Sequence, residues 1–450
     1  MAADPARFPG GERHSLAVLL DLIRSGQAVT RLDLERASSF GRAVVADRLA
    51  TLTGLGLVEE GARGPSMGGR APRTVRFRSE AGSLLVAGLD RSSLSVGLAD
   101  LSGRLLFEHH EAADLAAGPG PVIGRLVSLF DWVRDQQDRT TDLWGIGLGV
   151  PDAVETGGDD PFALPHLTLS PDWTESLALE RLVARYRAPV WVRSATQMAT
   201  LGECGPPQPE RRPDILFVDL GAEISAGLTS GGALHRGAKG IAGQIGHVCI
   251  DVESRVVCRC GNAGCLETRA GSAAIVRAAC AAVADGRSRW LAEAEAANGA
   301  LGVADIGLAA QLGDPLAAQL LADAGRLIGS VLAVLVNAVN PSRIILGGEL
   351  AQTGDILLAA VRKAVFRHAH PRMTRDLQIV RSDMGRAAAL AGAALLAVDE
   401  LFRPGMLGDW IAQGTPLRHP LMPEFLARAE AAMRAGPQPA GRRSPAVPVG

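Results

Sequence analysis

One short stretch, residues 247–265, constrains the fold more than any other because it holds five side chains able to bind a metal. One histidine and four cysteines fall within these nineteen residues: His247, Cys249, Cys258, Cys260 and Cys265. Gly261 and Gly264 let the backbone turn tightly around one point. Zinc takes four such ligands in a tetrahedron, and a site closed by four protein ligands is structural. The stretch therefore predicts a structural zinc site made by the last three cysteines and either His247 or Cys249.

Two other interpretations of these cysteines fit the sequence less well. Reduced, buried cysteines act as small apolar side chains, but the run Cys-Arg-Cys-Gly-Asn-Ala-Gly-Cys has glycines where a core segment needs side chains to pack. A disulfide framework would leave one of the three clustered cysteines unpaired, and the first residues lack the apolar core of a secretion signal. We therefore expect a reduced, cytoplasmic protein.

Charge is distributed unevenly along the chain. Residues 1–80 hold 12 Arg and 9 Asp or Glu, a balance of +3, and the rest holds 34 basic and 39 acidic residues, a balance of −5. Five arginines and no acidic residue lie within 61–79. A basic head on an acidic body indicates that only the head meets DNA. No apolar run reaches the about 20 residues of a membrane span.

The head has the pattern of a winged helix-turn-helix. Apolar spacing and a capping box at Thr30 predict three helices, and two strands with a basic loop follow. The predicted helices cover 15–25, 31–38 and 42–53, and the second strand covers 74–78. In such a domain the third helix enters the major groove, and the strand hairpin contacts phosphate or the minor groove.

The DNA-facing residues that this pattern predicts lie on the third helix and in the basic loop. They are Arg42, Ala43, Ala46 and Asp47 on the helix and Arg70 and Arg73 in the loop. Only two polar side chains lie near the start of that helix face, so phosphate contacts would supply much of the affinity. A three-helix interaction module with a solvated basic loop is the alternative.

From residue 83 onward, buried strands alternate with helices, which predicts a two-lobed α/β body with a cleft. Four motifs of this body resemble those of the ROK family (repressor, open reading frame, kinase). They are Ile146–Pro151, Gly240–His247, Cys258–Glu267 and Val339–Gly348. The resemblance covers residues 83–402 and implies an actin-like, sugar-kinase-like fold and a homodimer or homotetramer. It also implies zinc bound by His247, Cys258, Cys260 and Cys265, and the winged head matches the family's repressor branch.

The positions that a ROK kinase uses for phosphoryl transfer differ in this chain. The family's phosphate loop, Asp-x-Gly-Gly-Thr, corresponds to Asp90–Leu94, which lacks both glycines. The family's general base corresponds to Ala195, whose methyl group accepts no proton. The second phosphate loop corresponds to Gly221–Glu223, which brings a negative charge where phosphate would lie. The resemblance therefore implies a body with no catalytic residues.

The family's sugar-binding positions are retained only in part. The effector-binding residues that the resemblance implies are Gln244, His247, Glu267 and Ser194. Each lost hydrogen-bond partner lowers affinity by about 0.5–1.5 kcal/mol, so we expect either a different ligand or a weakly bound sugar. Gln244 and Glu267 can instead hold the zinc ligands of residues 247–265 in position through hydrogen bonds, without contacting an effector.

Together these observations predict three regions and a regulatory function. The regions are a winged helix-turn-helix domain over 1–80, a ROK domain over 83–402 (lobes 83–205 and 206–386, closing helix 387–402), and an appendage over 403–450 that is disordered from 436. The predicted function is a repressor that binds operator DNA and responds to a carbohydrate-like effector. Two alternatives stay open: an ATP-dependent hexose kinase, and a DNA-binding dimer that responds to no ligand.

Overall fold

The chain forms two compact units. The computed structural model describes residues 11–63, 73–136, 141–151, 154–155, 162–165, 167, 173, 176–205 and 213–436. The first unit comprises 1–198, 205–210 and 389–450, and the second comprises 199–204 and 211–388. Arg70 and the tail from residue 437 lie outside the described residues, so the expectations for them are not tested.

The head consists of three helices followed by a two-stranded antiparallel ribbon. These elements are α1 (Glu12–Arg24), α2 (Arg31–Ser38), α3 (Arg42–Gly54), β1 (Val58–Arg63) and β2 (Arg73–Phe77). Thr30 caps α2 as predicted, because its side chain accepts the backbone N–H of Asp33. The first helix begins at Glu12 rather than Ser15, since the Ser15 N–H already donates to the Gly11 carbonyl.

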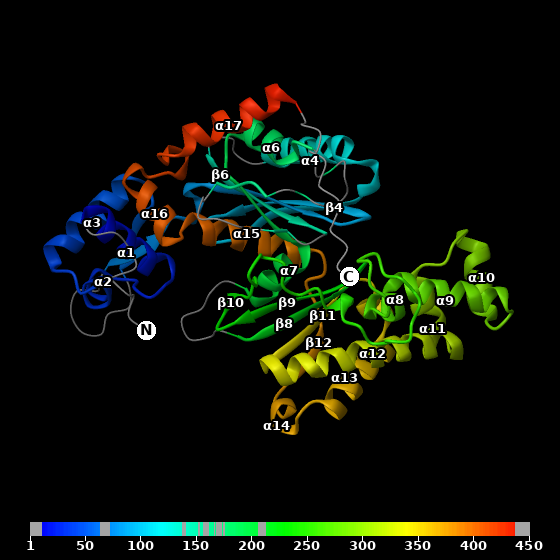
Figure 1. Cartoon of the computed structure of the whole chain (residues 1–450). Coiled ribbons are helices and arrows are strands. Elements are labelled where there is room, and N and C mark those ends of the chain that lie inside the picture. Colours follow the sequence, from blue (N-terminus) through cyan, green and yellow to red (C-terminus); the bar gives the residue numbers. More distant parts are fainter. Residues whose placement is uncertain are drawn as a thin grey trace, which may run out of the picture. The chain divides into compact units, whose positions relative to one another are not determined.

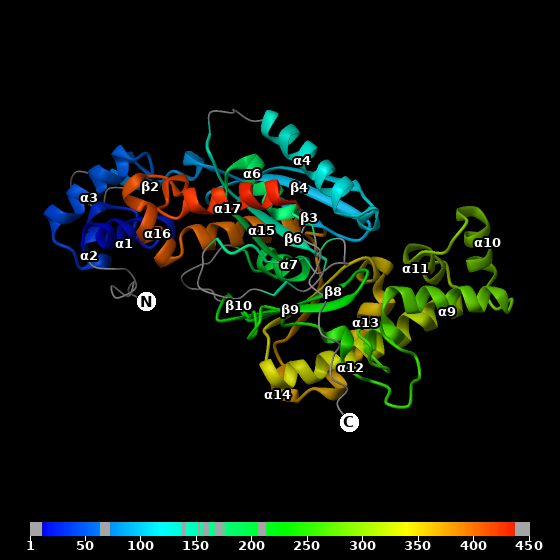
Figure 2. The ribbon, with the colours of Figure 1, turned by 45° about the horizontal axis from the view of Figure 1, so that its top comes forward.

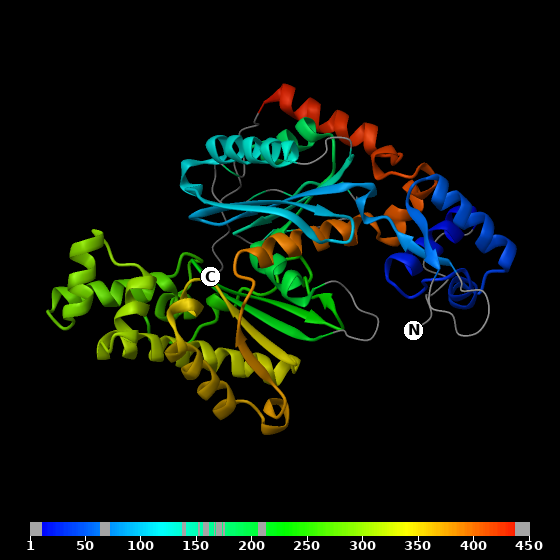
Figure 3. The ribbon, with the colours of Figure 1, turned by 180° about the vertical axis from the view of Figure 1, so that it is seen from behind.

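The first unit also contains a five-stranded mixed sheet in the order β5-β4-β3-β6-β7. Its strands are β3 (Ser83–Leu89), β4 (Ser93–Asp100), β5 (Leu105–Ala112), β6 (Leu143–Val150) and β7 (Val190–Ser194). Helices α4 (Pro119–Asp135) and α6 (Ala178–Tyr186) cover one face, and α15 (Ala387–Leu401) covers the other (Figures 1 and 3). Every residue of β4 and β6 is buried, as expected for strands covered on both faces.

The second unit contains a sheet with the same order and directions, β10-β9-β8-β11-β12. Its strands are β8 (Ile215–Leu220), β9 (Ile224–Ser230), β10 (Ala233–Leu234), β11 (Arg343–Gly347) and β12 (Gln378–Arg381). In both sheets the first three strands are antiparallel, and the last two join in parallel. The helices around it are α7 (Ala195–Cys204), α8 (Leu266–Ala270), α9 (Ser272–Ala284), α10 (Arg289–Asn298), α11 (Val303–Gln311), α12 (Pro315–Val339), α13 (Asp355–His368) and α14 (Pro371–Thr374).

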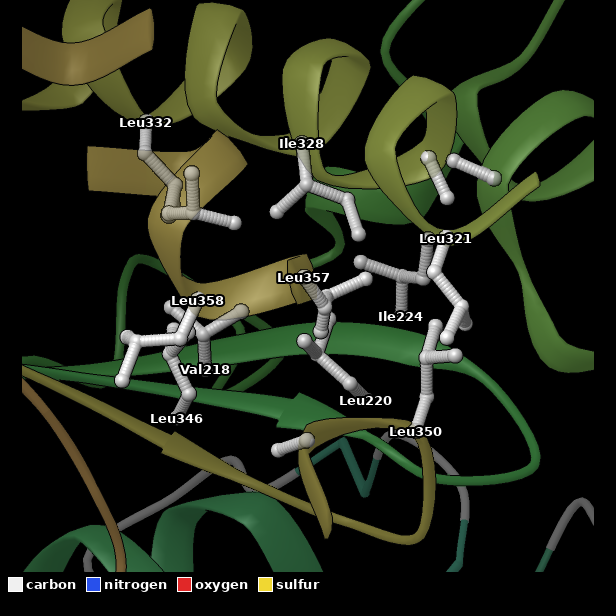
Figure 4. Close-up of a cluster of buried hydrophobic side chains, with 14 of the residues drawn as sticks. Val218, Leu220, Ile224, Leu321, Ile328, Leu332, Leu346, Leu350, Leu357 and Leu358 are labelled. Atoms are coloured by element: carbon white, nitrogen blue, oxygen red, sulfur yellow. The ribbon is translucent and has the colours of Figure 1, made fainter. Parts of the chain in front are cut away.

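Helix α12 carries much of the core of the second unit. In the described part of the chain it is the one helix long and apolar enough to cross a membrane by length and composition. Its side chains Leu321, Ile328 and Leu332 are fully buried and pack above Val218 and Leu220 of β8 (Figure 4). These contacts are those of a core helix.

The predicted appendage is helical and packs within the first unit. It contains α16 (Pro404–Trp410) and α17 (Met422–Ala435). Helix α16 contacts α1 of the head (Figure 2), and α17 contacts α6. The ring of Phe402, which precedes α16, stands edge-on to Phe77 of β2 with centroids 5.6 Å apart. The appendage therefore links the head to the first sheet.

Candidate functional site

Four side chains of residues 247–265, which we call the metal loop, converge on one point. The ligand atoms of His247, Cys258, Cys260 and Cys265 all lie within 4.8 Å of one another. The Sγ atom of Cys258 is 3.5 Å from Nδ1 of His247, and the Sγ atoms of Cys260 and Cys265 are 3.7 Å apart. Cys258 and Cys265 are buried, whereas Cys260 is exposed. This group can hold one metal ion.

Tight backbone turns build the loop that carries these ligands. The N–H of Cys258 donates to the Asn262 carbonyl at 2.7 Å, and the N–H of Gly261 donates back to the Cys258 carbonyl at 2.9 Å. Gly264 has a φ of +74°, and a Cβ there would lie 2.0 Å from the carbonyl oxygen of Asp251. Only glycine fits that position, and Cys265 directly after it is the last residue before helix α8.

The thiols differ in how readily they ionise. The backbone N–H of Asn262 lowers the pKa of Cys260. Burial raises the pKa of Cys265 to about 12, and the neighbouring thiols add to this. Because the thiolate is the form that binds metal, a cation in the cluster would have to displace the Cys265 proton. Metal binding at this site therefore releases protons.

Cys249, the other candidate for the fourth ligand, lies beside the cluster. It pairs with Cys265 in an isolated β-bridge, and its side chain is exposed. The four ligand atoms that gather come from His247 and the three later cysteines. The geometry thus favours His247 over Cys249.

Glu267, which follows the metal loop in α8, makes a hydrogen bond that ties this segment to strand β9. Its Oε2 accepts the backbone N–H of Ile224, the first residue of β9, at 2.7 Å. A Cβ at Gly271 would lie 2.3 Å from its Oε1, and one at Gly246 would lie 3.0 Å from its Oε2. The carboxylate is therefore held closely between these glycines and joins the metal loop to the sheet.

The remaining effector candidates occupy different settings. Gln244 precedes the short 3-10 helix Ile245–His247 and is exposed. Ser194 ends β7 in the first unit, where its hydroxyl accepts the N–H of Gln197 in α7. Gln244, His247 and Glu267 lie together in the second unit, and Ser194 belongs to the first.

A hydrogen-bonded turn and an ion pair stand at the two positions that correspond to the phosphate loops of a ROK kinase. The N–H of Asp90 donates to the Ser93 carbonyl at 2.8 Å, which closes a tight turn between β3 and β4. Glu223, between β8 and β9, forms an ion pair with Arg259 of the metal loop. Ala195 is the first residue of α7. Sequence reasoning missed the Glu223–Arg259 pair, because 36 residues separate its members.

The expected reading face of α3 is on the surface. Arg42, Ala43, Ala46 and Asp47 are all exposed, whereas Val45, Leu49 and Leu52 are buried. Asp47 forms an ion pair with Arg48, whose Nη1 lies 2.6 Å from Oδ2 of Asp47. Of the four exposed residues, Arg42 is therefore the polar one that makes no ion pair among the described residues. Arg73 forms an ion pair with Glu60 at 3.1 Å.

Arg48 was not singled out from the sequence, yet it fixes α3 against α1. Its Nη1 donates to Glu12 at 2.9 Å and its Nε donates to the Ser15 hydroxyl at 3.0 Å. These partners lie more than thirty positions away, so no local pattern could indicate them. Arg48 therefore positions α3 against α1.

Comparisons with known proteins agree with the fold and the motifs. The sequence model of the ROK family matches residues 98–400. The DNA-binding transcriptional dual regulator NagC of Escherichia coli is 25% identical over 382 residues, which are 84% of this chain and 91% of NagC. A glucokinase of Halalkalibacterium halodurans is 30% identical over 256 residues, which are 57% of this chain and 76% of the glucokinase.

A solved structure covers nearly the whole chain. It is a ROK family transcriptional regulator described as a homologue of the E. coli Mlc protein. The TM-score is 0.70 at 24% identity, over 89% of this chain and 99% of that one. This likeness shows that the fold is shared.

Proposed function

Because the chain belongs to the ROK family, we propose that it is a DNA-binding transcriptional regulator, a repressor whose sugar-kinase-like body senses a carbohydrate-like effector. The observation that carries the proposal is coverage: the similarity to the regulator NagC extends over 84% of the chain, against 57% for the glucokinase. The proposed domains are 1–80 for DNA binding, 83–402 for the ROK body and 403–450 for the appendage.

The proposed DNA interface is a winged helix-turn-helix with α3 in the major groove. Arg42 at the start of α3 is exposed and makes no hydrogen bond or ion pair among the described residues, so its guanidinium is available to a base or a phosphate. Ala43, Ala46 and Asp47 would lie at the same surface, with Arg70 and Arg73 on the wing. A dimer would present two heads to inverted half-sites.

Genomic footprinting of the full chain, followed by a mobility-shift assay on the recovered sites, tests this interface. We expect Arg42→Ala to weaken operator binding at least about tenfold, the usual effect of losing one charged contact. Arg372→Ala, at an exposed arginine on α14, is the matched control for the lost charge. Recovery of no specific sites, or equal binding by both variants, would contradict the proposal.

The metal that we propose for the cysteine cluster is zinc in a structural role. Zinc bonds of about 2.3 Å to sulfur and about 2.0 Å to nitrogen place ligand atoms roughly 3.5–3.8 Å apart in a tetrahedron. The separations of 3.5 and 3.7 Å in the cluster support this ion. Four protein ligands leave no open position for a substrate, so the zinc would order the loop rather than catalyse.

Metal analysis of the purified protein tests the zinc proposal. We expect about one zinc per chain, lost in Cys258→Ser and retained in Cys280→Ser, whose thiol lies on α9 outside the cluster. Retention of zinc in Cys249→Ser would show that Cys249 is not the fourth ligand and would leave that place to His247. Well-folded wild-type protein free of zinc would overturn the proposal.

The proposed effector contacts are Gln244, His247 and Glu267, together with Ser194. Gln244 is the one most available to a ligand, because it is exposed and makes no side-chain hydrogen bond among the described residues. A thermal-shift screen of sugars and amino sugars tests the effector. Stabilisation by a sugar that Gln244→Ala reduces would support it, and no stabilisation by any ligand would favour the ligand-independent dimer.

The kinase alternative is favoured by the similarity to the glucokinase. We propose that this chain does not transfer phosphate, because Ala195 stands at the general-base position and the pair of Glu223 with Arg259 occupies the second phosphate loop. An ADP-release assay across common hexoses tests this. Asp219, on β8, is a carboxylate near the second phosphate loop. Turnover that Asp219→Asn abolishes would establish the kinase. We also propose that the chain forms a homodimer or homotetramer, which light scattering would test. We propose that it is located in the cytoplasm, which cell fractionation would test.

A further inference from the structure

A cavity of about 220 Å³ lies in the first unit, where the chain leaves the head and enters the first sheet. One wall is the connecting segment from Arg76 of β2 to Ser83 of β3. The other comes from β4, β5, the end of α4 and Thr141. Its charged lining consists of Arg76, Glu80, Asp100, Arg104 and Arg134. None of these residues belongs to the metal loop or to the proposed DNA face.

Backbone bonds hold both walls in place. The N–H of Leu101 donates to the Ser79 carbonyl at 2.9 Å, and the N–H of Ser83 donates to the Asp142 carbonyl at 2.9 Å. Gly82, between them, packs so closely on Trp144 that a Cβ would lie 2.6 Å from the indole ring. The cavity is therefore formed before any ligand arrives, which lowers the cost of binding.

Both acidic groups of the lining already have partners. Glu80 accepts from Arg76 at 3.0 Å. Asp100 accepts the hydroxyl of Ser102 and the backbone N–H of Arg104, whose guanidinium lies 3.6 Å from the same carboxylate. Arg134, in the last turn of α4, makes no hydrogen bond or ion pair among the described residues. Among the described residues, the guanidinium of Arg134 is therefore the cation of this cavity that is left without an anion.

We propose that this cavity binds the phosphate group of a small phosphorylated molecule. A guanidinium presents paired donors that match phosphate oxygens, and Ser79, Ser83 and Thr141 add hydroxyl groups to the lining. The volume is below the roughly 300–1,000 Å³ of sites for drug-sized ligands, which limits the occupant to a small molecule. The site is distinct from the proposed effector residues.

Occupancy of this cavity would act on the head, a consequence that rests on the proposed DNA-binding function. Arg76 lies on β2 of the head, next to Phe77, whose ring contacts Phe402. Phe402 contacts Trp410, and Trp410 contacts Trp144 beneath Gly82, with centroids 5.7 and 5.4 Å apart. A ligand that fixes the connecting segment would thus fix β2 against the sheet and change operator affinity.

Titration calorimetry of the full chain with inorganic phosphate tests the binding site without DNA. We expect one site per chain, with affinity lowered about ten- to a hundredfold in Arg134→Gln and also lowered in Arg104→Gln. Arg181→Gln, at an exposed arginine of α6 with no partner among the described residues, is the matched control. Absence of phosphate binding, or binding unchanged in both cavity variants, would overturn the proposal.

A second measurement separates this site from the proposed function. Operator binding is followed at constant ionic strength with phosphate or with chloride. A phosphate effect that Arg134→Gln removes supports the coupling. Phosphate binding with no operator binding at all would refute the proposed function and leave the site standing. Competition between short DNA duplexes and phosphate, lost in Arg134→Gln, would mean that the cavity holds a DNA phosphate, and would overturn the small-molecule ligand.

Discussion

Among single residues, Gly264 is the one on which the metal loop depends most directly. A side chain there would meet the Asp251 carbonyl oxygen at 2.0 Å, and its φ of +74° is unfavourable for other residues. We expect Gly264→Ala to lower both the zinc content and the free energy of unfolding, by more than the about 1–2 kcal/mol of a left-handed residue. Gly286→Ala is the matched control, because its φ is +68° and its surroundings are open. Equal zinc content in the two variants would contradict this.

His419 in the appendage is a buried residue whose protonation should affect stability. Its side chain is buried, Nδ1 accepts the N–H of Leu421 at 3.1 Å, and its ring stands edge-on to Phe162. Burial lowers the pKa of His419 below its ordinary 6.5. The unfolded chain therefore binds this proton first as pH falls, so the stabilisation is complete above pH 6.5 and is lost as pH falls through the folded pKa.

Burial raises the pKa of Asp399 to about 6, which favours the folded state as pH falls and opposes the effect of His419. We therefore expect the contribution of His419 as a difference: between about pH 7 and pH 5 the melting temperature should change less favourably in the wild type than in His419→Gln. Thermal unfolding across this range measures the difference. His235→Gln, at an exposed histidine, is the control and should keep the wild-type dependence. A His419→Gln variant with the wild-type pH dependence would show that other groups cause it.

At the scale of elements, α12 is the helix whose packing should contribute most to the second unit. Ile328 is 0% exposed and lies in the core between α12 and the sheet (Figure 4). We expect Ile328→Ala to lower the free energy of unfolding by about 2–5 kcal/mol, because the lost methyl groups leave a cavity. Val334, on the same helix, is 66% exposed, so Val334→Ala should have little effect. Denaturant unfolding of both variants measures this, and similar losses would argue against the packing described.

Local patterns were enough to predict the elements of the head. The helix over 31–38 depends on Thr30 and Asp33, three positions apart, and the buried face of the next helix follows from Val45, Leu49 and Leu52. The metal ligands were accessible for the same reason, since His247 and the cysteines lie within one short loop. Each of these features is set by neighbours in sequence.

Features that depend on distant residues could not be predicted. The pair of Arg259 with Glu223 and the tie from Glu267 to Ile224 join segments 36 and 43 positions apart. The contact of the appendage with the head brings Phe402 against Phe77, more than three hundred positions earlier. Such contacts follow from the tertiary arrangement of sheets and helices, which periodicity alone does not fix.

For the whole molecule, the charge distribution sets how operator binding should respond to salt. The head carries +3 and the rest of the chain −5, so the body adds no attraction for DNA. Of the head arginines whose side chains the structure describes, Arg13, Arg36 and Arg42 make no ion pair or hydrogen bond. Among the described side chains of the head, three cations are thus free to replace the counterions of the DNA.

We therefore expect a shallow salt dependence for the whole chain, in which each phosphate contact contributes about −0.9 to the slope of log K against log salt. If Arg42 contacts phosphate, Arg42→Ala reduces that slope by about 1 and weakens all sites alike. If Arg42 reads a base instead, the slope is kept and discrimination at one operator position is lost by about 1–3 kcal/mol. Fluorescence anisotropy between about 50 and 200 mM salt, with Arg372→Ala as the control, separates the two roles. No change in slope or in discrimination would remove Arg42 from the interface.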